Sequence, residues 1–303
     1  MHKEIQFTFN FGNGRKLEMD RYTAACQKLG YSEKIVDSNQ MHLLSEGDLP
    51  YAVINMAQTT NETHTRYLRE LELSNVRVVN SILKSRIADD KMLSYLELRN
   101  MGMPVPKTKN LHLQSNDQSV VKYVERTFEF PCVLKVHNMS HGRGIYRVDT
   151  VSQLIDLTSM IWACSARFGD YQSTSNLIVQ EYMKTSVGRS IRVIVLNGEC
   201  LGGMLRENTN PDDWKMRPAP VWGQWQGTEF NYAPFKVETE LEKNCIKICS
   251  SLGLSYAGLD IFFGDTEFIF GEINTQPSFL TFEYCHPTIQ IPELVLEYLI
   301  KNK

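Results

Sequence analysis

The chain has 303 residues, of which 42% are hydrophobic and 22% are charged, and its formal net charge is −3. This composition is ordinary for a globular protein, and the slightly acidic balance argues against a broad nucleic-acid-binding surface. No run of about 18 apolar residues occurs, so the sequence predicts neither a membrane span nor a membrane partner.

Cysteine and histidine usage narrows the class of protein further. The seven cysteines form no CxxC pair, and the seven histidines show no HExxH spacing. An odd cysteine count without a framework suits a reducing compartment, and the start of the chain lacks the apolar core of a signal peptide. We therefore expect a cytoplasmic protein, and we do not expect a zinc protease.

The first 80 residues have the pattern of a small α/β unit. Residues 61–73 are amphipathic, with Tyr67, Leu68 and Leu71 at helical spacing. The predicted elements are strands at 5–9, 51–55 and 76–79 and helices at 20–29 and 61–73.

The middle of the chain mixes helices with short apolar strands. A helix over 89–101 is expected to end at Gly102, with Pro104 just beyond as a stop signal. Residues 104–116 then read as a crossing segment. Further predicted elements are helices at 118–127 and 151–166 and strands at 132–136, 145–148 and 177–181.

The last third begins with a hairpin whose strands, 190–196 and 200–206, flank the turn Asn197-Gly198. An amphipathic helix over 239–252 follows and is closed by Gly253, and a C-terminal helix is predicted at 291–300. Helices and strands alternate throughout, so the fold class is α+β or α/β.

The hairpin over residues 257–274 carries the most informative polar residues. Side chains alternate across a strand, so Glu272 and Asn274 share one face. If Phe263 lies opposite Glu267, Asp260 points to that same face from the partner strand. Two carboxylates and an amide among apolar strands would suit a hard cation such as Mg²⁺. The alternative is a hairpin with a polar outer face.

Lys135 lies in an apolar strand, where a lysine is unusual. Either it contacts a ligand or the strand is an edge strand with a solvated lysine. The next loop contains Ser140, Gly142 and Gly144, whose backbone could fold over phosphates. The GxxxxGK[ST] pattern is absent, and the loop could equally be an ordinary turn.

Two further features could serve a nucleotide. The strand ending in Gln180, Glu181, Tyr182 and Met183 could present backbone groups to an adenine edge, or could simply leave the core. Several cations flank the hairpin and together favour an anion site, although each alone would be an ordinary surface charge. These cations are Arg192, Arg206, Lys215 and Arg217.

In order along the chain, these motifs resemble the RimK-type carboxylate–amine ligases of the ATP-grasp superfamily. The resemblance runs from about residue 50 to the end. It includes the segment around Asn80 and Ser81, the Asp90-Lys91 step, and Gly188 with Ser190-Ile191-Arg192 where the family usually has G-x-D-I-R. It implies an ATP-grasp fold, two α+β subdomains clasping ATP, after a small α/β pre-ATP-grasp domain. The implied boundaries are 1–85, 86–182 with the phosphate loop, and 183–303 with the metal site.

The same resemblance implies a role for each candidate residue. Lys91 and Lys135 would contact the nucleotide phosphates, with Ser140, Gly142 and Gly144 in the phosphate loop. Gln180, Glu181, Tyr182 and Met183 would hold adenine, partly through backbone groups, and Ser190 would face the ribose. Asp260, Glu272 and Asn274 would hold Mg²⁺, with Mn²⁺ as a substitute. Arg192, Arg206 and Lys215 would neutralise the transferred phosphate.

The implied chemistry is ligation in two steps. A substrate carboxylate attacks the γ-phosphate of ATP, and an amine then displaces phosphate from the acyl phosphate to give an amide. The implied partners are ATP, a carboxylate substrate and an amine acceptor, either an amino acid or a peptide. The oligomeric state is left open, with a homo-oligomer as one option.

Two departures from the family pattern stand out. Ser190 replaces an acidic residue, and the loop after Arg206 lacks the N-x-H-R-G-G continuation of the ribosomal-protein glutamate ligases. That loop carries Trp214, Trp222 and Trp225, which could line a substrate pocket or fill the core. Two alternatives therefore stay open: an ATP-binding regulatory protein without turnover, and a peptide-tailoring enzyme acting on a partner polypeptide.

Overall fold

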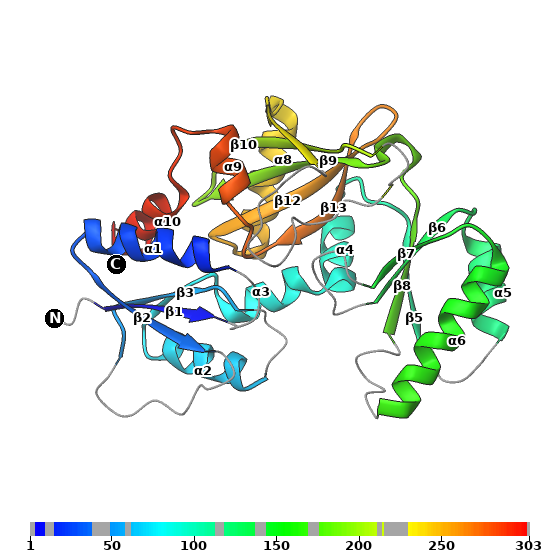
Figure 1. Ribbon diagram of the computed structural model, residues 1–303, viewed down its shortest axis with the longest axis horizontal. Helices are drawn as coiled ribbons and strands as arrows, with labels where there is room; N and C mark the ends of the chain where they lie inside the picture. Colours follow the sequence, from blue (N-terminus) through cyan, green and yellow to red (C-terminus); the bar gives the residue numbers. More distant parts are fainter. Residues whose placement is uncertain are drawn as a thin grey trace.

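The computed structural model describes residues 4–9, 15–37, 49–57, 62–112, 118–136, 144–168, 176–210, 214 and 230–301. Its strands form three sheets that follow one another along the chain, and helices α3 and α4 lie between them (Figure 1). This mixed architecture confirms the predicted fold class. No helix within the described ranges is both long and apolar enough to cross a membrane.

The first sheet is parallel. Its strands, in spatial order, are β2 (Ser32–Asp37), β1 (Glu4–Phe9), β3 (Ala52–Asn55) and β4 (Arg77–Val79). Two helices cover it, α1 (Lys16–Lys28) and α2 (Glu62–Leu73), one on each side in Figure 1. Strand β2 was not predicted. It is an edge strand whose residues are exposed or half-buried, so it lacks an apolar pattern.

A pair of short helices links this sheet to the rest of the chain. The predicted helix over 89–101 is α4 (Lys91–Asn100), which begins two residues later than expected, and the helix before it, α3 (Ile82–Asp89), was not predicted. They are separated at Asp90, whose carboxylate accepts from the backbone N–H groups of Met92 and Leu93 at 2.9 and 2.8 Å. Asp90 is thus the N-cap of α4, which explains why the helix begins at Lys91.

The second sheet is antiparallel. In spatial order it contains β5 (Thr108–His112), β8 (Asn176–Glu181), β6 (Cys132–Val136) and β7 (Ile145–Val148), with α5 (Gln118–Thr127) and α6 (Val151–Phe168) packed beside it (Figure 1). Strand β5 lies in the segment predicted to cross without structure. It pairs only with β8, and it carries the polar residues Lys109 and Asn110, which hid the strand pattern.

The third sheet is antiparallel and holds most of the candidate site. Its spatial order is β11 (Phe230–Phe235), β10 (Glu199–Asn208), β9 (Arg189–Leu196), β12 (Tyr256–Phe263) and β13 (Phe268–Asn274). The helical elements of this part are η1 (Lys184–Ser186), α8 (Thr239–Leu252), α9 (Leu280–Cys285) and α10 (Ile291–Lys301). Sequence patterns predicted α8 and α10, but not β11 or α9.

The first and third sheets share a hydrophobic core, whereas the second sheet does not take part in it. One core contains Ile5 and Phe7 of the first sheet together with Ile194 of the third and Val295 of α10. A second core joins α8 to the opposite face of the third sheet. The core of the second sheet contains only buried residues between Leu111 and Val179. The first and third sheets therefore share packing, whereas the second sheet has a core of its own.

Candidate active site

A row of charged residues crosses the third sheet. Asp260 of β12 lies directly opposite Arg192 of β9 on one side and opposite Glu272 of β13 on the other. Cross-strand neighbours have their side chains on the same face of a sheet. The sheet thus brings together one cation and two carboxylates from three strands, and the shared face of the two carboxylates is the one expected for this hairpin.

A β-bulge produces this alignment. The expected pairing of Phe263 with Glu267 was wrong, because Phe263 lies opposite Phe268. Continued without interruption, the observed register would pair Asp260 with Gly271 and turn Glu272 to the other face. The register shifts between Asp260 and Ile261, which restores the pairing of Asp260 with Glu272. The bulge therefore sets the geometry of the two carboxylates.

Two arginines hold the carboxylate of Asp260. Arg192 donates to it through Nε at 2.7 Å and Nη2 at 2.8 Å, and Arg206 Nη2 lies 3.1 Å from Oδ1. Burial alone would raise the pKa of Asp260, but the charges and hydrogen bonds of the two guanidiniums lower that pKa to about 2. Asp260 is therefore an anion throughout the physiological pH range.

Ser190 lies opposite Arg206 in the register of β9 and β10 and is almost fully buried. Its hydroxyl oxygen accepts from Nε of Arg206 at 3.1 Å and from Nη2 at 2.8 Å. Sequence reasoning expected Ser190 to face a ribose. In this structure it positions Arg206, and through Arg206 it helps to hold Asp260.

Glu272 pairs with one lysine and influences a second one from another part of the chain. Lys91, the first residue of α4, lies with Nζ 3.4 Å from Glu272 Oε1. Burial lowers the pKa of Lys135 to about 8, with the charge of Glu272 opposing this shift and that of Lys91 adding to it. The second and third sheets thus contribute charges to one cluster, defined here as Lys91, Lys135 and Glu272.

Lys135 is not on an edge strand. Strand β6 lies between β8 and β7, so the alternative of a solvated edge lysine was wrong. Its ammonium donates to Gln180 Oε1 at 2.6 Å, and Gln180 Nε2 donates to Thr108 Oγ1 at 2.9 Å. Gln180 therefore orients Lys135, a role that its place in the strand pattern did not reveal.

The residues after Gln180 form a short connection between the second and third sheets. The backbone N–H of Glu181 donates to Lys107 O at 2.9 Å, so this donor is occupied in the structure. The ring of Tyr182 lies edge-on to Trp214 at 5.8 Å between centroids, and the guanidinium of Arg147 lies 4.9 Å from the Tyr182 centroid. Met183 O accepts from the N–H of Ser186 at 3.1 Å.

The donor set fits a hard cation. Asp260 and Glu272 are adjacent carboxylates, and Asn274 adds an amide two residues beyond Glu272 on the same strand. Asp260 already accepts from Arg192 and Arg206, so it would share its carboxylate between these arginines and a bound cation. Within the described ranges no three His, Cys, Asp or Glu side chains converge as a metal centre, so the set consists of two carboxylates and one amide.

Several predicted residues lie outside the described part of the chain, namely Ser140, Gly142, Lys215, Arg217, Trp222 and Trp225. Gly144 is described. It has a positive φ of 63°, which favours glycine, and its carbonyl accepts from the N–H of Val136 at 2.8 Å.

Sequence analysis placed Asn80 in a family-like segment but assigned it no role, and in the structure it joins the first sheet to the strands of the site. This buried amide accepts from the N–H groups of Ser255 and Tyr256, both at 2.9 Å. It donates to the carbonyls of Tyr256 at 2.5 Å and Thr275 at 2.8 Å. Asp89 holds the same segment by accepting from Thr275 Oγ1 at 2.7 Å. A polar residue directly after an apolar strand was the available signal.

Comparisons with known proteins identify the family of this chain. A family model described as a RimK-like ATP-grasp domain matches residues 88–299. Beta-citrylglutamate synthase B of Danio rerio is 25% identical over 217 residues, covering 71% of this chain and 49% of that protein. A probable alpha-L-glutamate ligase of Aliivibrio salmonicida (strain LFI1238) is 21% identical over 298 residues, covering 93% of this chain and 91% of that protein. The chain thus spans about half the length of some relatives and most of others.

Solved structures share the fold. The D-cycloserine synthetase DcsG superposes with a TM-score of 0.71 at 16% identity, covering 98% of this chain and 99% of its own. The ATP-grasp ligase PsnB, complexed with a minimal precursor, gives a TM-score of 0.70 at 18% identity, and the match covers both chains fully. Because the family model matches residues 88–299, which make up most of this chain, the chain belongs to the RimK-like ATP-grasp domain family.

Proposed function

We propose that this protein is an ATP-dependent carboxylate–amine ligase that forms an amide bond through an acyl phosphate. The observation that carries the proposal is the ion pair of Lys91 with Glu272, which lies beside the Asp260–Arg192 pair and within electrostatic range of Lys135. Two ammonium groups next to two carboxylates are suited to a triphosphate bound with a divalent cation. The proposed division of the chain stays 1–85, 86–182 and 183–303.

Each residue then has a role in binding or in charge neutralisation. Lys91 and Lys135 contact the phosphates, and Gln180 keeps the Lys135 ammonium in place. Glu272, Asn274 and Asp260 hold Mg²⁺, or Mn²⁺ in its place. The bound cation supplies neutralisation of phosphate charge. Glu181, Tyr182 and Met183 border the adenine, with Ser140, Gly142 and Gly144 in the phosphate loop.

Arg192 and Arg206, with Lys215, stabilise the phosphoryl group as negative charge builds on it. Arg192 donates to Asp260 through Nε and Nη2, and no described residue accepts a hydrogen bond from its Nη1. A planar guanidinium held by a carboxylate is oriented before the substrate arrives, which lowers the cost of reorganisation. The protein thus contributes positioning and electrostatics and needs no covalent intermediate of its own.

The substrates proposed are a carboxylic acid and an amino acid or peptide amine. Relatives named as a citrylglutamate synthase, an N-acetylaspartylglutamate synthase and glutamate ligases support an amino acid acceptor. Structures of PsnB and of the macrocyclase MdnC with precursor peptides support a peptide as the other option. Glutamate itself is not assigned, because the loop after Arg206 lacks the N-x-H-R-G-G pattern. The cytoplasmic location and the oligomeric state stay predictions.

The proposal is tested by measuring ADP release from Mg·ATP against a panel of carboxylic acids, amino acids and short peptides. The expected result is release that requires both a carboxylate and an amine, together with hydroxamate formation when hydroxylamine replaces the amine. Binding of Mg·ATP without hydroxamate from any acid would instead support a regulatory protein without turnover.

A further inference from the structure

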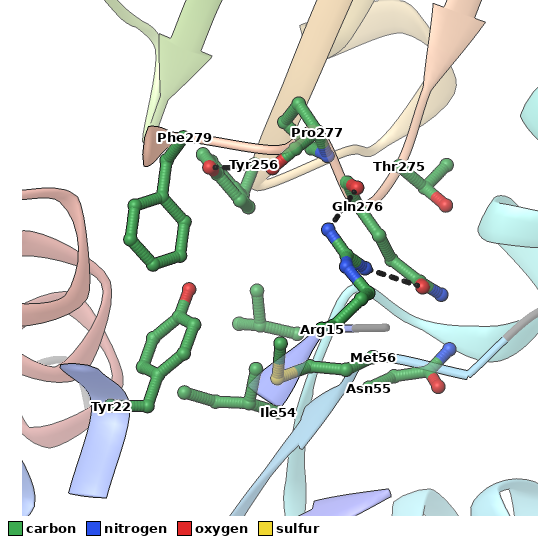
Figure 2. Close-up of a pocket in the computed structure, with 11 residues that line it drawn as sticks. Arg15, Tyr22, Ile54, Asn55, Met56, Tyr256, Thr275, Gln276, Pro277 and Phe279 are labelled. Carbon is green, nitrogen blue, oxygen red and sulfur yellow. Dashed lines mark hydrogen bonds between the residues drawn. The ribbon is translucent and has the colours of Figure 1, made fainter. Parts of the chain in front are cut away.

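A pocket lies between the first sheet and the segment that follows β13 (Figure 2). The space within it is about 290 Å³, with the open solvent at its mouth included. Arg15, Asn55 and Gln276 give it polar walls, and Ile54, Met56 and Phe279 give it apolar ones. Thr275, Gln276 and Pro277 line it, and in the chain they directly follow Asn274 of the proposed cation site.

The topology of the first sheet also indicates a ligand site here. The strand order β2-β1-β3-β4 reverses between β1 and β3, because β1 pairs with β2 on one side and β3 pairs with β4 on the other. In open parallel sheets, ligands bind outside the carboxyl ends of the strands at such a reversal. Asn55 is the last residue of β3, and Arg15 directly precedes the helix that follows β1.

Asn55 presents an unpaired donor to this pocket. The residue is only 3% exposed, and its Oδ1 accepts from Thr8 Oγ1 at 2.9 Å and from the N–H of Ala57 at 3.2 Å. These two bonds fix the orientation of the amide. Its Nδ2 has no hydrogen-bond acceptor in the described part of the chain. Buried donors are rarely left without a partner, so this one points to a ligand that accepts.

Arg15 adds further donors from the opposite side. Its Nη2 donates to Gln276 O at 2.9 Å (Figure 2). Its Nε forms an ion pair with the buried Glu18. Nη1 lies 3.5 Å from Gln276 Oε1, a long contact. The guanidinium is thus held in place by two partners while it still has N–H groups to offer. A planar fork of this kind suits a carboxylate.

We infer that this pocket binds a carboxylate of a small substrate, one that does not itself react, through Arg15 and the Nδ2 of Asn55. The apolar side chains of Ile54, Met56 and Phe279 pack against the aliphatic part of that substrate. This inference rests on the proposed function, since it makes the pocket the anchor for a molecule whose reacting group lies toward Asn274. The carboxylate belongs either to an amino acid acceptor or to a dicarboxylic donor.

The test uses direct binding without ATP, measured by saturation-transfer NMR. The probes are L-valine with L-valinamide, and succinate with succinamide. The wild-type protein is expected to bind at least one carboxylate at least about tenfold more tightly than its amide. Binding of valine identifies the acceptor as the source of the carboxylate, and binding of succinate identifies the donor.

Two variants connect the binding to the pocket. Asn55→Asp retains an oxygen to accept from Thr8 and Ala57 but removes the Nδ2 donor and adds negative charge. It should weaken carboxylate binding at least about tenfold and leave Mg·ATP binding, measured by calorimetry, unchanged. Arg15→Lys keeps a cation beside Glu18 but loses the fork, and it should also weaken binding.

Several outcomes would overturn the inference. These are no binding of either carboxylate to the wild-type protein, equal binding of an amide, or unchanged affinity in the variants. If Asn55→Asp does not fold, the affinity of Arg15→Lys decides the question. Carboxylate binding without ADP release would refute the proposed ligase and retain the pocket, whereas ADP release unaffected by both variants would refute the pocket and retain the ligase.

Discussion

Asp260 and Glu272 are adjacent carboxylates in very different surroundings. Both oxygens of Asp260 are held by guanidinium groups, whereas the side chain of Glu272 is 39% exposed and has Lys91 beside it at 3.4 Å. A group that is already paired and buried is costly to alter. Glu272 is therefore the better position for removing a proposed cation ligand without disturbing the fold.

Glu272→Gln is expected to reduce turnover at least about a hundredfold, since loss of one electrostatic partner of the reacting group typically costs about 3 kcal/mol of barrier. The melting temperature should change little because the side chain is partly exposed. Glu267→Gln, in the exposed turn of the same hairpin, is the matched control and should retain activity. Steady-state ADP release measures both. Near wild-type turnover in Glu272→Gln would refute the assignment of this ligand.

The lowered pKa of Lys135 predicts how the affinity for ATP depends on pH. Its pKa is lowered to about 8, so in the free protein it loses its charge as the pH rises through that value. The affinity for ATP should then fall by up to about tenfold for each pH unit above the pKa. Calorimetric titrations from about pH 7 to about pH 9.5 would show this decline.

Lys135→Arg provides the control, because an arginine stays charged over that range. The variant should bind ATP with an affinity that no longer falls across the alkaline pH range. A wild-type affinity that is constant over the same range would show that Lys135 does not pair with the phosphates.

At the scale of elements, the hairpin β12–β13 depends on the bulge beside Asp260. Gly271 lies at the bulge, and a Cβ added there would come within 2.4 Å of the ring of Phe262. Gly271→Ala should therefore destabilise the protein by about 1–3 kcal/mol through overpacking. Urea unfolding measures this change.

A second substitution tests the cause. Phe262→Leu removes the ring atoms that the new methyl group would meet. The double variant should therefore lose less stability than the sum of the losses in the two single variants. Additive losses would show that Gly271 is required for another reason, such as backbone conformation.

Elements with a strong local pattern were predictable, and those defined by pairing partners were not. Helix α8 has Leu241, Cys245 and Leu252 on one buried side and ends at Gly253 in a left-handed conformation, so its bounds followed from the sequence. Strands β2 and β5 are edge strands, and their residues are too polar to show a strand pattern. They form because β1 and β8 offer backbone partners.

The candidate site shows the same limit. Asp260, Glu272 and Lys135 were predictable because charges inside apolar strands are conspicuous, whereas Lys91 was implied by the family resemblance alone. The paired arginines on Asp260 and the bonds from Arg206 to Ser190 depend on the register across β10, β9 and β12. A one-residue slip would alter every one of these contacts, and the sequence alone does not determine where a bulge falls.

At the scale of the whole molecule, the cores predict unequal stability. The first and third sheets share a core, and Asn80 bonds the two together, whereas the second sheet has a separate core. Hydrogen exchange should show β5, β6, β7 and β8 opening as one unit, independently of the other two sheets.

Asn80→Ala should lower the free energy of unfolding of the first and third sheets by about 3 kcal/mol, because the backbone groups of Ser255, Tyr256 and Thr275 lose their partner. Hydrogen exchange by mass spectrometry would show faster exchange in those sheets and no change in the second. A uniform change across all three sheets would contradict this division of the molecule.

The central claim, ligation through an acyl phosphate, is tested most directly by following oxygen from the carboxylate. A carboxylic acid labelled with ¹⁸O that supports ADP release is incubated with Mg·ATP, the amine and the protein, and the released phosphate is analysed by mass spectrometry. Transfer of one labelled oxygen to phosphate is the predicted result, because the amine displaces phosphate from the acyl phosphate. ADP release that yields only unlabelled phosphate would contradict the account, since water rather than the carboxylate would then have attacked the nucleotide.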